Sequence, residues 1–337
     1  MSGIEEVVLS VFDVDRACAP LVALGGYRRV DLPDASASQA AAWQVPAGCA
    51  RIEQVLLVPP GGTRGALRVV CFHGLERTLI RPSQRTWDTG GIFDLDIFSK
   101  DVRSTYRRLQ QEYGWTAFGE PVDYVMGEFD VTQVVAIGPD GLVLAIIEPH
   151  RPPSFALPPF EAMSRIFNST QMVRSIDAAL DFYCGTLGWK ALVDMTIDDA
   201  VEPGADVLGV PMPAARTCAR RVAIVHPEGV NDGSIELIEI AGFEGRDYAD
   251  RAVAPNVGLL TLRLSVSAIR AYAQEIADRG AIFHSPLGLV ETAPYGPVLS
   301  FSVRAPDGAI LDFYEPASGD AEMKRGGVLS TDFPPVG

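Results

Sequence analysis

Apolar side chains follow two rhythms along the chain, and the rhythms come in the same order four times. Each copy begins with a stretch in which every second residue is apolar, which is the spacing of a β-strand. An apolar residue at every third or fourth position follows, as on one face of a helix, near residues 13–27, 102–113, 175–187 and 269–279. Short alternating stretches complete each copy. The pattern predicts four strand–helix–strand–strand–strand modules, two in each half of the chain.

The third copy shows the helix signal most clearly. Ser175 is a residue type that caps the start of a helix, and Gly188 stands where a helix end favours positive φ. Between them one apolar face is formed by Ile176, Leu180, Tyr183 and Leu187. This copy therefore predicts a helix that begins after Ser175 and ends before Gly188.

Five prolines between residues 149 and 161 interrupt all periodicity, so this stretch is expected to link two halves of ordinary domain size. We predict a domain at 1–150, a linker at 151–161, a second domain at 162–316 and a loosely held tail at 317–337.

Two stretches of similar sequence close the second and the fourth copies. GPDGLVLAIIEP lies at 138–149 and APDGAILDFYEP at 305–316. Both are a turn followed by an apolar strand, and both end in Glu-Pro, so Glu148 and Glu315 are expected to accept hydrogen bonds from an adjoining loop. The second stretch alone carries a carboxylate in mid-strand, Asp312, where the first has Ala145.

Bulk composition excludes several classes of protein. The chain has 337 residues, 47% of them hydrophobic and 21% charged, and a net charge of -15 that disfavours nucleic acid and anionic membranes as partners. No apolar run is long enough to cross a bilayer, and the N-terminus has no basic, signal-like segment. The five cysteines are scattered, which is typical of reduced thiols in a cytoplasm.

The stretch ALDFYCGTLGW and the repeated Pro-Asp-Gly turns resemble the glyoxalase / bleomycin resistance / extradiol dioxygenase superfamily, also called vicinal oxygen chelate proteins. The resemblance covers residues 4–150 and 162–316. It implies an α+β fold in which paired βαβββ modules form open, curved mixed sheets around cavities, here as two tandem domains. Members include isomerases, dioxygenases, lyases, epimerases and drug-binding proteins, so the fold does not decide the activity.

The resemblance also implies positions for metal ligands. Metal-dependent relatives place a His, Gln or Glu near the start of a module's first strand and a Glu in its last strand. In the C-terminal half these positions hold Asn168 and Leu259 in first strands and Glu236 and Asp312 in last strands. In the N-terminal half they hold Glu6, Ile92, Ala145 and either Arg68 or Val69. Because side chains alternate along a strand, Asp312 and Tyr314 are expected on the cavity face.

These positions predict a site in the C-terminal half. Glu236 and Asp312 would either hold one divalent ion, with Asn168 and water completing the shell, or transfer protons. Magnesium, calcium or manganese would suit such oxygen ligands, whereas a typical iron extradiol dioxygenase would need two histidines. The alternative for both acids is a structural one, in which they face solvent or pair with arginine.

Two functions remain open. The first is an enzyme acting on a small apolar or aromatic oxygenated molecule, with Asn168, Leu259, Tyr314 and His226 as candidate binding residues. The second is a metal-free protein that binds and sequesters a small molecule; the missing histidines and the apolar N-terminal face favour it. His226 ends a strand near the expected cavity, yet a structural role is the more common one for such a histidine. Both a monomer and a homodimer are compatible with the sequence.

Overall fold

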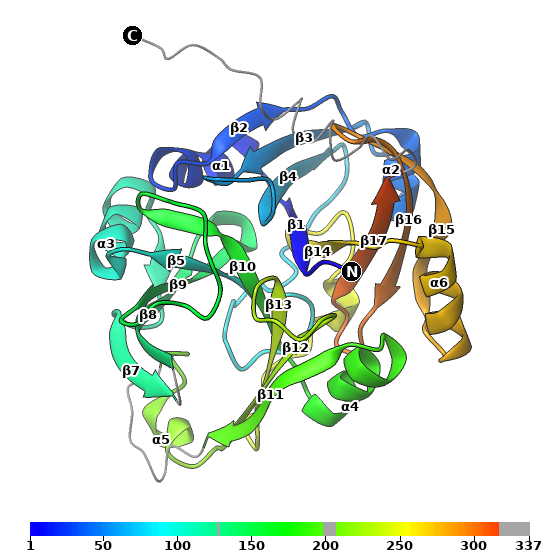
Figure 1. Ribbon diagram of the computed structural model, residues 1–337. Coiled ribbons are helices and arrows are strands. Elements are labelled where there is room, and N and C mark those ends of the chain that lie inside the picture. The colour runs from blue at the N-terminus through cyan, green and yellow to red at the C-terminus, as the bar shows by residue number, and fades with distance from the viewer. Residues whose placement is uncertain (127–128, 198–206, 317–337) are drawn as a thin grey trace.

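The computed structural model describes residues 1–126, 129–197 and 207–316; the predicted tail at 317–337 lies outside these residues. The chain forms four βαβββ modules in two open mixed sheets, as predicted (Figure 1). The first module contains β1 (Ile4–Ser10), α1 (Val14–Ala23), β2 (Arg28–Asp31), α2 (Ala37–Ala42), β3 (Arg51–Val58) and β4 (Ala66–His73). The second contains β5 (Asp94–Ser99), α3 (Val102–Tyr113), β6 (Thr116–Ala117), β7 (Val122–Met126), β8 (Phe129–Ile137) and β9 (Val143–Pro149).

The other two modules follow the linker, which has no strand or helix. The third contains β10 (Met163–Met172), α4 (Ile176–Leu180), β11 (Lys190–Ile197), α5 (Met212–Ala215), β12 (Arg220–His226) and β13 (Ser234–Ile240). The fourth contains β14 (Gly258–Ser265), α6 (Ile269–Asp278), β15 (Phe283–Thr292), β16 (Gly296–Arg304) and β17 (Ile310–Pro316). A π-helical turn at Asp181–Thr186 continues α4.

Strand pairing does not follow the two halves of the sequence. Modules one and four form an eight-stranded sheet in the order β15-β16-β17-β14-β1-β4-β3-β2, which we call the outer-module sheet. Modules two and three form a nine-stranded sheet, β11-β12-β13-β10-β5-β9-β8-β6 with β7 beside β8, which we call the inner-module sheet. In Figure 1 the blue and the orange-red parts of the chain accordingly share one sheet. The expectation of one cavity within each half is thus wrong, because each sheet takes one module from either half.

One continuous apolar core joins both sheets with helices α1, α3, α4 and α6. Leu311 and Phe313 of β17 belong to this core, and the ring of Phe313 packs against Tyr272 of α6 with centroids 5.4 Å apart. Asp312, between them, points to the opposite face, as the alternation of β17 predicts. Each sheet thus has one face in the core and one face available for polar groups.

Helix starts are fixed by acidic and hydroxyl side chains. Asp101 and Ser175 cap α3 and α4 through their own side chains. Glu148 accepts a hydrogen bond from the amide of Val102, and Glu315 accepts from the amides of Ala268 and Ile269. The prediction that Glu148 and Glu315 bind an adjoining loop is confirmed: each ties the end of a module's last strand to the start of its helix.

The aspartates of the two Pro-Asp-Gly turns connect neighbouring modules. Asp140 accepts hydrogen bonds from the amides of Phe12 and Asp13, and Asp307 accepts one from the amide of Arg174. The two modules of each half are therefore braced together, although they contribute to different sheets. Among the described residues no helix is long and apolar enough to cross a membrane.

Candidate functional site

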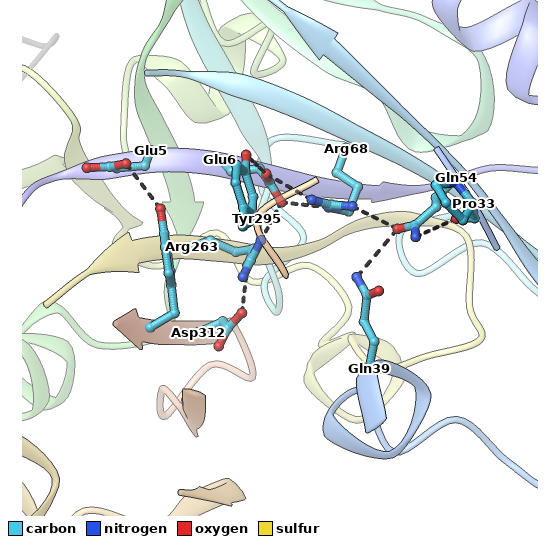
Figure 2. Close-up of polar contacts among 10 residues, drawn as sticks. Glu5, Glu6, Pro33, Gln39, Gln54, Arg68, Arg263, Tyr295 and Asp312 are labelled. Atoms are coloured by element: carbon cyan, nitrogen blue, oxygen red, sulfur yellow. Dashed lines mark hydrogen bonds and ion pairs between the residues drawn. The ribbon is translucent and has the colours of Figure 1, made fainter. Parts of the chain in front are cut away.

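The outer-module sheet carries four charged side chains on the face opposite to the core and to helices α1 and α6. Glu6 of β1 accepts from Arg68 Nε of β4 at 2.7 Å and from Arg263 Nη1 of β14 at 2.7 Å (Figure 2). Arg263 Nε also donates to Asp312 of β17 at 2.7 Å. All four residues are buried. We call these residues the ion-pair cluster; its two acids and two guanidinium groups balance in charge.

Further polar groups surround the ion-pair cluster. The Tyr295 hydroxyl donates to Glu6 at 2.7 Å, and Gln54 accepts from Arg68 at 2.7 Å. Burial alone would raise the pKa of Glu6, but Arg68 and Arg263 outweigh it and hold this pKa well below its usual range. Glu6 is therefore ionised at any ordinary pH and unsuited to proton transfer.

Helix α2 covers this face of the outer-module sheet. Ser36 Oγ donates to the carbonyl of Glu291 on β15 at 2.7 Å, and Ser38 Oγ accepts from the amide of Glu291 at 2.9 Å. The cavity between Trp43 and Asp312 measures about 20 Å³. That is room for a single water molecule, so the cavity beside Asp312 is too small for a substrate.

The inner-module sheet carries a different set at the corresponding place. Asp94 and Asp96 on β5 lie opposite Thr170 and Asn168 on β10, and Thr170 also lies opposite Glu236 on β13. Thr170 Oγ1 donates to Glu236 at 3.2 Å. Asp94, Asp96 and Asn168 are buried, at 2%, 5% and 3% exposure, whereas Glu236 keeps partial contact with solvent. We call these five residues the carboxyl site.

The three acids of the carboxyl site have unusual electrostatics. Burial raises the pKa of Asp94 to about 6, and burial with the nearby charge of Asp94 raises that of Glu236 to about 7. Burial and the neighbouring Asp94 and Glu236 raise the pKa of Asp96 well above its usual value. Within the described residues none of the three makes a salt bridge to Lys or Arg; Arg81 lies near enough to lower the pKa of Asp94 in part. Because of these raised pKa values, the carboxyl groups of the site keep part of their protons at neutral pH.

Among the described residues no N–H or O–H group donates to Asp94 Oδ1, Asp96 Oδ1 or Asn168 Oδ1, although the neighbouring Asp94 and Asp96 carboxyls hydrogen-bond each other when one is protonated. The half-buried Tyr124 of β7 borders the same site, since the charges of Glu236 and Asp96 add to the effect of burial in raising its pKa. Its hydroxyl donates to Gln133 of β8. Unsatisfied buried acceptors call for an explanation, and a bound molecule with donor groups would supply one.

The site predicted from the sequence is divided by the structure. Asn168 and Glu236 come together on the inner-module sheet, because β13 pairs with β10 in parallel register. Asp312 lies in the other sheet, because β17 pairs with β14. The prediction of one site containing Glu236 and Asp312, whether catalytic or metal-binding, is therefore wrong; the structural alternative, pairing with arginine, applies to Asp312.

The other predicted binding residues lie outside the carboxyl site. Leu259 faces the helix-covered core, because a bulge opposite Val8 and Leu9 shifts the register of β14. Tyr314 does lie on the expected face, but its hydroxyl donates to Glu5 and its ring stacks with Arg263. His226 accepts from two turn amides through Nδ1, and burial lowers its pKa to about 4, which makes it a neutral turn residue.

Asp94 and Asp96 are functional candidates that the sequence patterns did not single out. The superfamily resemblance puts the ligand position of this strand at Ile92, but Ile92 is buried in the core, and β5 begins at Asp94. The stretch Phe-Asp-Leu-Asp-Ile could have indicated them, since two acids that alternate with apolar residues on one strand lie on the same face of the sheet.

The donor set does not fit the metal that the superfamily resemblance implies. Among the described residues no three His, Cys, Asp or Glu side chains are grouped so that they could share one ion. In the ion-pair cluster guanidinium groups take up the space beside the acids. The expectation of a divalent ion thus finds no support in the arrangement of either site.

Comparison with known proteins places the fold. The family model described as Glyoxalase/Bleomycin resistance protein/Dioxygenase superfamily matches residues 165–313. Glyoxalase I from Zea mays superimposes with a TM-score of 0.61 at 15% identity, covering 96% of this chain and 95% of that one. A putative dioxygenase from Bacillus subtilis gives 0.56 at 12% identity, with 98% and 91% coverage. No curated protein matches the sequence significantly. At such identities the solved structures establish the fold alone.

Proposed function

Since residues 165–313 place this chain in the Glyoxalase/Bleomycin resistance protein/Dioxygenase superfamily, we propose that it is an enzyme that transfers a proton on a small organic molecule at the carboxyl site. The observation that carries the proposal is the contrast between the two sheets. The acids of the ion-pair cluster are neutralised by arginine, whereas Asp94 and Asp96 are buried beside the partly buried Glu236 with no ion pair to Lys or Arg among the described residues. Burying like charges costs stability, and sites that do so are commonly functional.

Glu236 is the proposed base. A general base works best when its pKa lies near the working pH, and a pKa of about 7 meets this condition. Its partial exposure also makes it the one acid of the site that an entering molecule reaches first. Glu236 would take a proton from a carbon next to a carbonyl group, and the electron pair would move onto the carbonyl oxygen.

The remaining groups would position the molecule and return the proton. Tyr124 lies at the border of the site, and its hydroxyl would turn from Gln133 to donate to the oxygen that becomes negative. Asp96, whose pKa is raised well above its usual value, would supply a proton from β5 while Glu236 acts from β13. Return of the proton to the same or a neighbouring atom gives an epimerisation or an isomerisation, and loss of a leaving group gives an elimination. No step in this scheme depends on a metal ion.

Proton exchange tests the proposal even while the natural substrate is unidentified. The full-length protein is incubated in D₂O with a panel of small hydroxyketones, aminoketones and 2-oxo acids, and loss of the C–H signal is followed by ¹H NMR. We expect exchange of at least one compound, reduced 100-fold or more in Glu236→Gln, in line with the usual contribution of a general base. Glu239→Gln is the matched control, because Glu239 lies on the same strand but caps α4.

Exchange that is unaffected by Glu236→Gln would refute the assignment of the base. Binding without turnover is the second candidate function, and the apolar residues Val143 and Ala145 at the ligand position of β9 favour it. A compound that binds at the carboxyl site and is recovered unchanged and unexchanged would support sequestration instead.

A further inference from the structure

We propose that the molecule bound at the carboxyl site is an organic cation, a protonated amine on a small apolar body. The inference rests on the proposed function only in taking the carboxyl site as the working site; it names the chemical class of the ligand. Three observations support it: the acceptor oxygens of the site, the charges around them, and the apolar side chains beside them.

The carboxyl site presents acceptors that lack a donor. Asp94 Oδ1, Asp96 Oδ1 and Asn168 Oδ1 are buried oxygens that receive no N–H or O–H from the described residues, and the only link between the two aspartates is a proton that they would share. Asp96 and Asn168 lie directly opposite each other on neighbouring strands, where side chains are about 5 Å apart. An ammonium group has three N–H donors and no acceptor, so it can satisfy several such oxygens at once.

The surrounding charges favour a positive ligand. Two arginines lie near the site; among the described residues neither forms an ion pair with its acids, although Arg81 lowers the pKa of Asp94 in part. Arg81 donates to the carbonyls of Arg85, Asp88 and Gly90, and Arg220 lies beside Tyr124. This sheet therefore holds two buried acids and the partly buried Glu236 where the other sheet buries two acids with two arginines. A cation of the ligand would complete the charge balance that Arg68 and Arg263 supply in the ion-pair cluster.

The spacing of the acids favours an organic cation over a metal ion. Hard metal ions need oxygen ligands within about 2.0–2.6 Å of one centre, and no three suitable side chains in the described part of the chain are so grouped. Hydrogen bonds from an amine reach oxygens at about 2.8 Å, in several directions. Two acceptors with an amide oxygen beside them thus suit the N–H groups of an amine.

Apolar side chains flank the acids on the same face. Ala145 of β9 lies opposite Asp96, and Ile224 of β12 lies opposite Glu236. Small and branched apolar side chains beside the acids would contact a carbon skeleton and would offer nothing to a second charged group. The expected ligand therefore has one cationic group and an apolar remainder.

Binding of an amine would also prepare Glu236 for its proposed role. A cation among the acids favours their ionised form, so the carboxyl proton leaves to solvent as the ammonium binds. The carboxylate left on Glu236 is the form that can accept a proton from the ligand. Amine binding should therefore release protons, and the release should be largest near pH 6–7, where burial has placed the pKa values of Asp94 and Glu236.

Three probes of one size and different charge test the inference. Benzylamine, benzyl alcohol and benzoate are titrated into the full-length protein at pH 7 with EDTA present, by calorimetry in two buffers of different ionisation enthalpy. We expect benzylamine to bind at least tenfold more tightly than benzyl alcohol, with proton release, and benzoate to show no binding. Asp96→Asn and Glu236→Gln should each remove this preference, whereas Glu239→Gln should keep it.

Several outcomes would overturn the inference. Equal binding of benzylamine and benzyl alcohol would show that charge is not recognised. Preferential binding of benzoate would point to an anionic ligand held by Arg220. Micromolar binding of Mg²⁺, Ca²⁺ or Mn²⁺ that Asp96→Asn abolishes and benzylamine cannot displace would assign the site to a metal. Amine binding without any proton exchange on carbon would leave this inference standing and refute only the proposed enzyme activity.

Discussion

Removal of Arg263 should show how much of the protein's stability depends on the ion-pair cluster. Arg263 is 3% exposed and joins Glu6 and Asp312 through two contacts of 2.7 Å. Arg263→Met would leave Asp312 buried without a guanidinium partner, while Glu6 keeps Arg68. Removing one partner of a buried ion pair typically costs about 3–5 kcal/mol. That is a large share of the ~5–15 kcal/mol that stabilises most domains.

Urea unfolding at pH 7 measures the loss. Arg221→Met is the matched control, since Arg221 pairs with Asp177 and Asp194 at the surface, where such a change costs about 1 kcal/mol or less. The double variant Arg263→Met with Asp312→Leu should recover much of the loss, because it removes the unpartnered charge. A loss from Arg263→Met no larger than that from Arg221→Met would refute the reasoning.

The depressed pKa of Glu6 also determines how the stability of the protein should change with pH. The pKa of Glu6 is depressed from its ordinary 4.5, so its contribution is complete above that pH and falls as the pH drops below it. Stability of the unaltered protein should thus decline in acid. The difference between it and Arg263→Met should narrow below pH 4.5, because the part of the stability that Glu6 gains from Arg263 is lost there.

Two further predictions concern the other acids. The raised pKa of Glu236 means that the folded protein keeps a proton that the unfolded chain loses, so stability should fall as pH rises from about 4.5 to 7. Glu236→Gln should therefore stabilise the protein by roughly 1–3 kcal/mol at pH 8 and leave it unchanged at pH 4.5; destabilisation at pH 8 would contradict the assigned shift. Glu315→Ala should lower the unfolding free energy by about 1–2 kcal/mol and Glu148→Ala by about 1 kcal/mol, as for lost helix caps. The exposed Glu120→Ala is the control, and an equal effect there would dismiss the capping role.

Local patterns in the sequence were enough to predict the modules and the faces of most strands. The cap at Ser175, the positive φ of Gly188 and the outward face of Asp312 all follow from neighbours a few residues away. The predicted positions along two strands were wrong where a local irregularity shifted the strand. The bulge opposite Leu9 turned Leu259 into the core, and the connection from β4 to β5 extends to Phe93, which moved the ligand position from Ile92 to Asp94 and Asp96.

Module pairing could not be predicted, because it is decided by contacts between distant strands. Every first strand offers similar backbone hydrogen-bonding edges, so the periodicity of β1 is compatible with either β5 or β14 as its partner. The deciding contacts, such as Glu6 with Arg263, join residues 257 positions apart. A prediction that assumes neighbouring modules share a sheet will therefore combine residues, here Glu236 and Asp312, that the fold separates.

The observed pairing also divides the buried charges between the sheets in a functional way. If each half formed its own sheet, Arg68 would lie with Asp94 and Asp96, and Arg263 with Glu236, so neither sheet would be neutral and neither would be free of arginine. The actual pairing brings both arginines into one sheet, where two acids neutralise them and α2 closes the face. The acids of the carboxyl site gather on the other sheet. One sheet can then stabilise the fold through its ion pairs, while the other carries the cost of acids buried without arginine partners, as the proposed site would require. The difference between Ala145 and Asp312 follows from this division, since each belongs to a different sheet and Asp312 serves the stabilising one.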